Sequence, residues 1–386
     1  MRDAFSLDPG ITHLNHGSFG TVPRIVQEHQ STIRGRAEAN PMRFFRVESP
    51  DLKAAARETA AKFLGVGADE VALVRNVTEA AATVLSALAW QGRLGPGDVL
   101  LVNQQGYESV RRTVGLWCGR TGASYDVVPL PASATPADVV AGYVAALDAV
   151  QARGDVPRLV VVDQISSPTG AVLPVAAVAQ AAHARGALVL VDGAHVPGHV
   201  EVSPAGTGAD FWTGTWHKWG FAPRGTSALW VTEAERDGLD PLTTSWNHGQ
   251  DFPLPFDTHG TDDYSGWFAL EAAVDFWREA GGFGLGERAR RMLEVGAGLV
   301  AAAVGTAPDV VADPSPCMRL VPLPPGVADT EPSADRLYLA LGARRIETQV
   351  VAYDGRGWIR LSGAAYNEPA DYERLADVLP EVLETR

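Results

Sequence analysis

The 386-residue sequence predicts an α/β fold with a large, mostly parallel sheet, followed by a smaller C-terminal α+β domain. Two observations predict it. From residue 99 to residue 231, short apolar runs alternate with longer helical patterns, which is the order of strands and helices in βαβ units. Beyond residue 316 the order changes to strand, helix, strand, strand and helix. We therefore divide the chain into an N-terminal arm (1–30), a large domain (31–265) and a small domain (266–386).

The first helices have clear end signals. Ser49 stands before Pro50 and is expected to cap a helix that ends at Gly65. Asn76 is expected to cap the next helix, which continues to about Ala89. Further strands are predicted at 99–103, 125–129, 159–163, 187–191, 211–212, 226–231, 317–323, 348–353 and 358–362, and further helices at 109–119, 136–152, 174–185, 265–280, 285–304, 334–341 and 370–383.

Composition excludes several classes of protein. The net charge of −14 argues against a nucleic-acid partner, because phosphate backbones select clustered Lys and Arg. No apolar run reaches membrane-spanning length and the first residues form no signal peptide, so we expect a cytoplasmic protein without membrane contact. Cys118 and Cys317 fit neither a disulfide framework nor a metal site. His248 and His259 lie near several acids, but their spacing matches no common ligand set, so we expect no metal.

The stretch from residue 187 to residue 225 carries the strongest chemical signal. A buried strand delivers Asp192 to its C-terminal end, where α/β sheets place their ligands, and Lys218 follows among aromatic residues. This is the pair that a pyridoxal phosphate enzyme needs, because the Lys forms a Schiff base and the Asp keeps the pyridine nitrogen protonated. The alternative is that Asp192 is a turn residue and that Lys218 extends to solvent. Small residues beside Asp192, together with His195 and His217, favour the cofactor.

Other candidate residues lie at helix and strand ends. The free N–H groups after Asn76, with the Thr78 hydroxyl, would bind an anion, although a capping box with nothing bound explains the same residues. Strand ends at Tyr107, Ser167 and Asp192 converge if the sheet is parallel. Tyr107 would then lie flat on a cofactor ring, or be an ordinary core aromatic.

A loop near the N-terminus has two interpretations. Residues 41–46 place Arg43 and Arg46 beside two Phe side chains. They predict either a lid over a substrate carboxylate or a packed loop.

With these residues in view, the chain resembles the class V aminotransferases of the fold-type I pyridoxal phosphate enzymes, and within them the isopenicillin N epimerase-like branch. The matching segments are LNHGSFGTVPR, NPMRFFR, RNVTEA, SSPTG, VDGAH, TWHKW and IETQVVAYDGRGWIRLSGAAYN. The resemblance implies a seven-stranded large domain. It also implies a homodimer with shared active sites and a small-molecule amino acid as substrate.

The resemblance implies a role for each matching residue. Lys218 would bind pyridoxal 5'-phosphate covalently and Asp192 would pair with its ring nitrogen. The remaining implied cofactor contacts are Tyr107 on the ring, Ser167 and His195 near its phenolic oxygen, and Val77, Thr78, Thr215 and His217 at the phosphate. Arg360 would hold the substrate carboxylate, with Asn15 and Arg43 as further substrate contacts. Thr261 resembles a residue that reaches the partner subunit's phosphate, but Asp262 and Asp263 follow where a basic residue is common.

The reaction is less determined than the cofactor. A cysteine desulfurase needs a nucleophilic Cys shortly before the carboxylate-binding Arg, and residues 353–360 contain none. We expect a β-lyase that cleaves the C–S bond of a cysteine S-conjugate in secondary metabolism, with an epimerase, a decarboxylating deaminase or an aminotransferase as alternatives. A protein that binds the cofactor only for structure or regulation is the non-enzymatic alternative. A bulky substrate tail would suit Trp212, Trp216, Trp219 and Trp246, and core packing explains these residues equally well.

Overall fold

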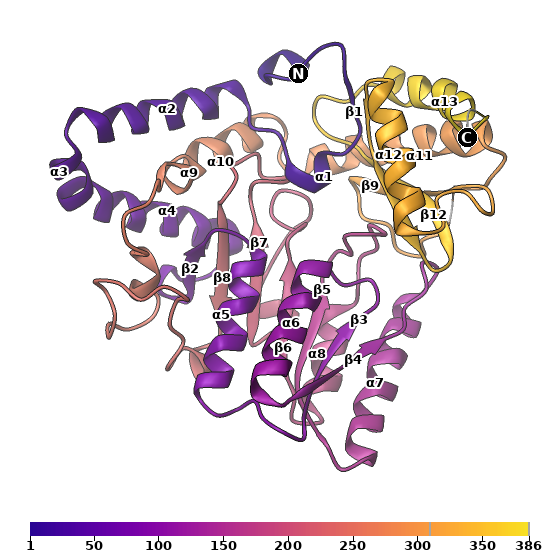
Figure 1. Cartoon of the computed structure of the whole chain (residues 1–386). Coiled ribbons are helices and arrows are strands. Elements are labelled where there is room, and N and C mark those ends of the chain that lie inside the picture. The colour runs from indigo at the N-terminus through magenta and orange to yellow at the C-terminus, as the bar shows by residue number, and fades with distance from the viewer. Residues whose placement is uncertain (309, 385–386) are drawn as a thin grey trace.

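The computed structural model describes residues 1–308 and 310–384. Its centre is a seven-stranded sheet of order β2-β8-β7-β6-β5-β3-β4 (Figure 1). The strands are β2 (Val71–Val74), β3 (Asp98–Asn103), β4 (Ser124–Val128), β5 (Val156–Asp163), β6 (Leu188–Gly193), β7 (Phe211–Thr215) and β8 (Ser227–Val231). Pairing is parallel from β7 through β4, and only β8 is antiparallel to its neighbours β2 and β7. The predicted fold class is confirmed.

Helices cover both faces of this sheet because its strands are apolar on both sides. On one face, α5 (Val77–Trp90) and α6 (Glu108–Thr121) pack against Leu159, Val161 and Leu190. On the other face, apolar side chains of α2 (Arg24–Ala39), α4 (Ser49–Leu64), α7 (Pro136–Ala152) and α8 (Val175–His183) share a core with Val189 and Val191. Asp192 has the parity of Leu190 along β6, so its side chain lies on the α5 and α6 face.

The C-terminal residues form a second core. Strands β9 (Met318–Pro322), β11 (Gln349–Tyr353) and β12 (Arg356–Ser362) make an antiparallel sheet of order β11-β12-β9. Helices α11 (Gly284–Ala303), α12 (Glu331–Ala343) and α13 (Pro369–Glu384) contribute to its apolar core. The arm joins this part of the chain, because β1 (Thr12–His13) pairs with β10 (Ile346–Glu347). The proposed domain limits stay a prediction, since α9 (Ser265–Phe268) and α10 (Leu270–Glu279) pack against α2 and α4 of the large domain.

Two predictions of local structure fail near the start of the large domain. Ser49 is not a cap, because it has helical dihedrals (φ −59°, ψ −37°) and follows α3 (Pro41–Arg43) and a π-helical turn (Phe44–Glu48) without a break. Asn40 is the cap instead, since its side chain accepts a hydrogen bond from Arg43 N at 3.1 Å. Strand β2 was not predicted, because four apolar residues beside a helix cap carry too little pattern.

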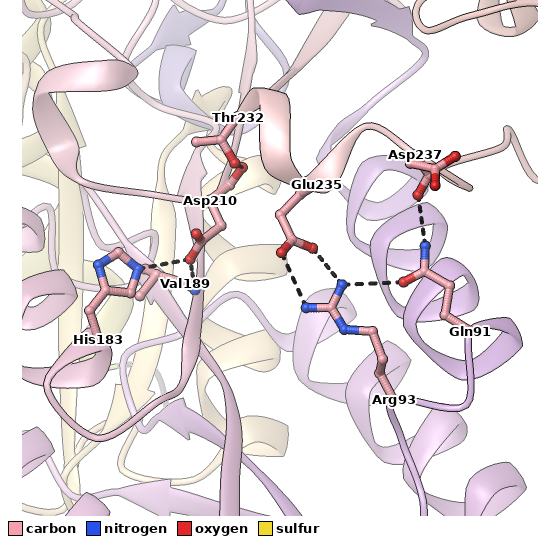
Figure 2. A network of polar contacts seen from close by, with 8 residues as sticks. All are labelled: Gln91, Arg93, His183, Val189, Asp210, Thr232, Glu235 and Asp237. Atoms are coloured by element: carbon pink, nitrogen blue, oxygen red, sulfur yellow. Dashed lines mark hydrogen bonds and ion pairs between the residues drawn. The ribbon is translucent and has the colours of Figure 1, made fainter.

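The edge of the sheet at which the parallel strands begin is closed by polar contacts, shown in Figure 2. Asp210 Oδ2 accepts hydrogen bonds from Val189 N at 2.7 Å and from His183 Nε2 at 2.9 Å. Arg93 forms a two-nitrogen ion pair with Glu235 at 2.6 and 3.2 Å. The opposite edge, at the carboxyl ends of the strands, is therefore the one left open for ligands. None of the described helices has the length and apolarity needed to cross a membrane.

Candidate active site

A cavity of about 960 Å³ opens at the carboxyl ends of the parallel strands. Three parts of the chain line it: the loops of the large domain, the helix α1 (His16–Phe19) of the arm, and the β11 and β12 strands of the small domain. The predicted site residues on its wall are Val77, Thr78, Tyr107, Ser167, Thr215, His217, Lys218 and Arg360.

Asp192 lies at the floor of this site, near the end of β6. Its Oδ1 atom accepts a hydrogen bond from Ala194 N at 2.9 Å. Its Oδ2 atom is buried and has no hydrogen-bond partner among the described residues. Burial raises the pKa of Asp192, and the Ala194 N–H and the Lys218 ammonium oppose this shift. A bare carboxylate oxygen on a buried floor is suited to a protonated ring nitrogen, which would supply the missing donor.

Lys218 and His195 lie together beside that carboxyl group. Lys218 Nζ is 3.2 Å from His195 Nε2. Burial lowers the pKa of Lys218 to about 8, Asp192 partly offsets this, and the Arg360 charge adds to it. Burial and the Lys218 charge hold the pKa of His195 well below its usual value, so the ring is neutral. Trp219 Nε1 donates to His195 Nδ1 at 3.3 Å, so the Nε2 atom carries the ring hydrogen and can donate it to Lys218 Nζ when that amine is neutral.

The phosphate end of the site is built by the first turn of α5. Asn76 caps this helix as predicted, accepting from Glu79 N at 2.9 Å. The N–H groups of Val77 and Thr78 belong to the first turn, and they lie at the positive end of the helix dipole. Thr215 Oγ1 lies 2.6 Å from His217 Nδ1 on the facing loop.

Two arginines that the sequence reasoning missed, Arg75 and Arg224, also line the phosphate end of the cavity. This end is therefore suited to a phosphate group.

Tyr107 presents an aromatic ring to the cavity. The Lys218 ammonium lies 6.0 Å from the centroid of the Tyr107 ring, which is 42% exposed toward the cavity. Gly193 is needed where it stands, because a Cβ there would come within 2.5 Å of the Trp212 ring. The bare Asp192 oxygen, the lysine, the aromatic platform and the helix N-terminus together fit pyridoxal phosphate.

Arg360 is the candidate residue for binding a substrate carboxylate, and it lies on the cavity wall. It is 2% exposed, and burial lowers its pKa to about 10, so it stays charged near neutral pH. One terminal nitrogen donates to the backbone oxygen of Ser167, and the other donates to Asn15 Oδ1 and Ser18 Oγ, each at 3.0 Å. Its Nε atom has no partner within the described part of the chain. Asn15 and Arg360 are 345 residues apart in sequence, yet the structure brings them together as the substrate prediction requires.

Arg43 and Thr261 do not lie on the cavity wall. Arg43 is exposed on α3 and lies 3.7 Å from Glu48 Oε1. Thr261 is exposed too, and its neighbour Asp262 pairs with Arg75 at 2.5 Å. Neither residue lines the cavity of one chain, and the roles predicted for them stay predictions.

The two cysteines lie away from the cavity wall as well. Both are buried free thiols. Burial raises the pKa of Cys118 to about 11 and raises that of Cys317 further. In the described residues, no group of three or more His, Cys, Asp or Glu side chains could hold a metal ion.

Sequence reasoning missed two further residues, which lie next to Lys218 and Asp192. His16 Nε2 lies 2.8 Å from the Lys218 carbonyl oxygen and joins the arm to the lysine loop. It stands in the LNHGSFG segment, so a signal was present. Asp163 is the last residue of β5 and Asp192 is the last but one of β6, and the two residues are in register. A second strand-end carboxylate was also visible in the sequence.

Comparisons with known proteins agree with this geometry. The sequence profile of the family "Aminotransferase class-V" matches residues 23–295. An isopenicillin N epimerase from Amycolatopsis lactamdurans is 31% identical over 405 residues, covering 99% of this chain and 97% of the relative. A putative L-cysteine desulfhydrase from Oryza sativa subsp. japonica is 30% identical, covering 97% of this chain and 84% of the relative.

Solved structures share the fold. The cysteine desulfurase CsdA from Escherichia coli superposes with a TM-score of 0.77 at 21% identity, covering 100% of this chain and 98% of that one. The cystine C-S lyase C-DES, in complex with its product cysteine persulfide, superposes with a TM-score of 0.76 at 19% identity, covering 96% and 97%. At these identities the likeness speaks for the fold alone.

Proposed function

This chain belongs to the class-V aminotransferase family and is a pyridoxal 5'-phosphate-dependent enzyme, and from that premise we propose that it cleaves the C–S bond of a cysteine S-conjugate as a β-lyase. When bound, the cofactor supplies an electron sink that weakens the bonds to the substrate α-carbon. The remainder of the proposal concerns what the residues of this chain do.

The proposed roles follow the positions of the side chains. Lys218 Nζ, with a pKa of about 8, would take the proton from the α-carbon near neutral pH and return it later. Asp192 Oδ2 would accept a hydrogen bond from the ring nitrogen. The His195 Nε2–H would donate to the phenolic oxygen, together with Ser167. Arg360 would hold the substrate carboxylate, beside Asn15.

The observation that carries the C–S lyase proposal is a lysine and a buried arginine in a cavity whose described wall contains no cysteine. Without a thiol to accept the sulfur, the leaving sulfur departs on the substrate fragment. An S-conjugate and one water then give a free thiol, pyruvate and ammonia. The cysteine desulfhydrase relative at 30% identity supports this assignment.

Epimerisation is the second candidate, because the relative at 31% identity is an isopenicillin N epimerase. Both reactions begin with loss of the α-proton, and they differ in whether the bond to the β-substituent survives. A decarboxylating deaminase would release carbon dioxide and keep the α-hydrogen. An aminotransferase would need a keto acid as second substrate.

One assay separates these candidates. Purified holoenzyme is incubated with a panel of amino acids and cysteine S-conjugates deuterated at the α-carbon. Thiol, pyruvate, ammonia, carbon dioxide and chirality are measured together. The proposal expects loss of deuterium with equal amounts of thiol, pyruvate and ammonia. An inverted α-centre on an intact skeleton, or carbon dioxide with retained deuterium, would overturn it.

We also propose a twofold-symmetric homodimer with both active sites near the interface. Thr261 and Arg43 support this, since both are exposed in a single chain and the family resemblance gives Thr261 a contact with the partner's cofactor phosphate. Asp262 pairs with Arg75, a residue of the phosphate end, so the segment containing Thr261 already lies next to that site.

A further inference from the structure

Asp163 is a second buried carboxyl group beside the cofactor site, and the proposed mechanism does not use it. It is the last residue of β5 and is the register partner of Asp192 on β6. Neighbouring strands lie about 4.8 Å apart, and register partners in a parallel pair point to the same face. Asp163 and Asp192 are each 4% exposed. Two acids therefore stand side by side on the face where the cofactor would bind.

The contacts of Asp163 are hydrogen bonds from neutral groups. Its Oδ1 atom accepts from Tyr107 N at 3.2 Å, and its Oδ2 atom accepts from Asn103 Nδ2 at 3.2 Å. Asn103 Nδ2 also donates to the hydroxyl of Tyr143 at 3.0 Å. No ion pair to Asp163 occurs in residues 1–308 and 310–384. The two hydrogen bonds fix both ends of the loop from Asn103 to Tyr107, which carries the Tyr107 ring.

The charges around the two carboxyl groups are unbalanced. The titratable groups that face Asp163 are Asp192, Tyr143 and Lys218. Lys218 is the one cation in this set. Its positive charge lowers the pKa of Asp192. Burial first, and the Asp192 charge second, raise the pKa of Asp163 well above its usual value. Two adjacent buried carboxylates facing one cation retain a proton between them.

Two side-chain oxygens next to Asp163 are buried and have no hydrogen-bond partner among the described residues. One is Asn103 Oδ1 and the other is Asp192 Oδ2. Of the two carboxyl groups, Asp192 therefore has the oxygen that is open to a donor, and Asp163 lies beside it in register.

We propose that Asp163 and Asp192 form a carboxyl pair that stores one proton in the cofactor-free protein and gives it to the ring nitrogen when the cofactor binds. The step is balanced. Before binding, the pair has one proton and one negative charge; afterwards both carboxylates are charged and the ring nitrogen carries the proton and a positive charge. Asp163 is thereby a positioning residue that acts through Asp192. The inference rests on the proposed role of Asp192 and is independent of which bond the enzyme cleaves.

The test counts protons. Binding of pyridoxal 5'-phosphate to the apoprotein is followed by calorimetry in buffers of different ionisation enthalpy across a pH series. The stored proton is absent in Asp163→Asn, which keeps the shape, so this variant should take up about one more proton per chain than the wild type at the pH of greatest difference. Asp126→Asn, which removes an acid on the edge strand β4 that pairs with Arg153, is the matched control and should equal the wild type.

The possible results distinguish failure of the proposed carboxyl pair from failure of the proposed role of Asp192. Equal proton uptake by the wild type and Asp163→Asn at every pH overturns the carboxyl pair. If Asp192→Asn also leaves uptake and the visible spectrum unchanged, the proposed role of Asp192 fails as well.

A second measurement on the apoprotein needs no cofactor. Because the folded-state pKa of Asp163 is raised above the unfolded value of about 3.9, its contribution to stability is present below that pH and is lost as pH rises through the folded pKa. The melting temperature of the wild type should therefore fall with rising pH more steeply than that of Asp163→Asn. Parallel curves would contradict the stored proton.

Discussion

Replacing Arg360 by Lys should impair substrate binding and orientation while leaving the cofactor in place. One terminal nitrogen of the guanidinium donates to Asn15 and Ser18, and the other donates to Ser167, so partly buried partners already fix the orientation of both nitrogens. Lys keeps the charge but has a single nitrogen, so at least one charged hydrogen bond to a substrate carboxylate is lost. Such a bond contributes about 1.5–3 kcal/mol, which corresponds to about a 10- to 160-fold fall in kcat/KM.

The assay is steady-state kinetics on the substrate found by the product panel. A matched control is Arg356→Lys on the same strand. Arg356 donates to the Leu323 carbonyl oxygen at 3.0 Å and stacks 5.4 Å from Trp358, and it is not on the cavity wall. The control should retain wild-type kcat/KM. Circular dichroism and the cofactor spectrum should show that both variants are folded and loaded. Unchanged kcat/KM in a folded Arg360→Lys would refute the reasoning and make Arg43 the next candidate for holding the carboxylate.

Four further outcomes are expected. Borohydride should attach the cofactor to Lys218, and peptide mass spectrometry that finds another lysine would reject the site. Reconstitution of the apoprotein should accelerate as pH rises through about 8, because burial lowers the pKa of Lys218 to that value and the neutral amine is the nucleophile; a flat rate profile would contradict this. Asp192→Ala should abolish turnover but retain bound cofactor, and near-normal turnover would exclude its role. Asp210→Ala should lower the free energy of unfolding by about 1–3 kcal/mol with kcat/KM unchanged, because it leaves the Val189 N–H unpaired; equal denaturant midpoints would argue against this.

The fold was largely predictable because its signals are local. Apolar runs separated by helical patterns predict β5, β6 and α7 within a few residues. Gly65 ends α4 with φ 69°, where a left-handed backbone favours glycine. Asn76 caps α5 because its side chain needs only a residue three positions away. The failure at Ser49 has the same origin, because the competing cap at Asn40 begins a short helix that then continues through a π-turn.

The site was predictable where a motif carries the residue, and not where distant parts of the chain meet. Asp192 and Lys218 follow from strand-end chemistry. The contact of His16 with the Lys218 carbonyl oxygen spans 202 residues, and no periodicity reports it. Asp163 carried the same strand-end signal as Asp192, but its partner on the next strand is visible only once the register is known. The roles predicted for Arg43 and Thr261 stay predictions, because neither residue lines the cavity of one chain.

The way the arm is attached has a mechanical consequence. Strand β1 is paired with β10 of the small domain, and a few residues later His16 bonds to the backbone of Lys218. At Gly20 the chain passes so close that a Cβ would lie 1.7 Å from the His217 carbonyl oxygen. Any swing of the small domain that carries Arg360 toward a substrate must therefore pull on the arm, and through it on the lysine loop. The arm therefore connects β10 to the lysine loop, and a displacement of either one would be transmitted to the other.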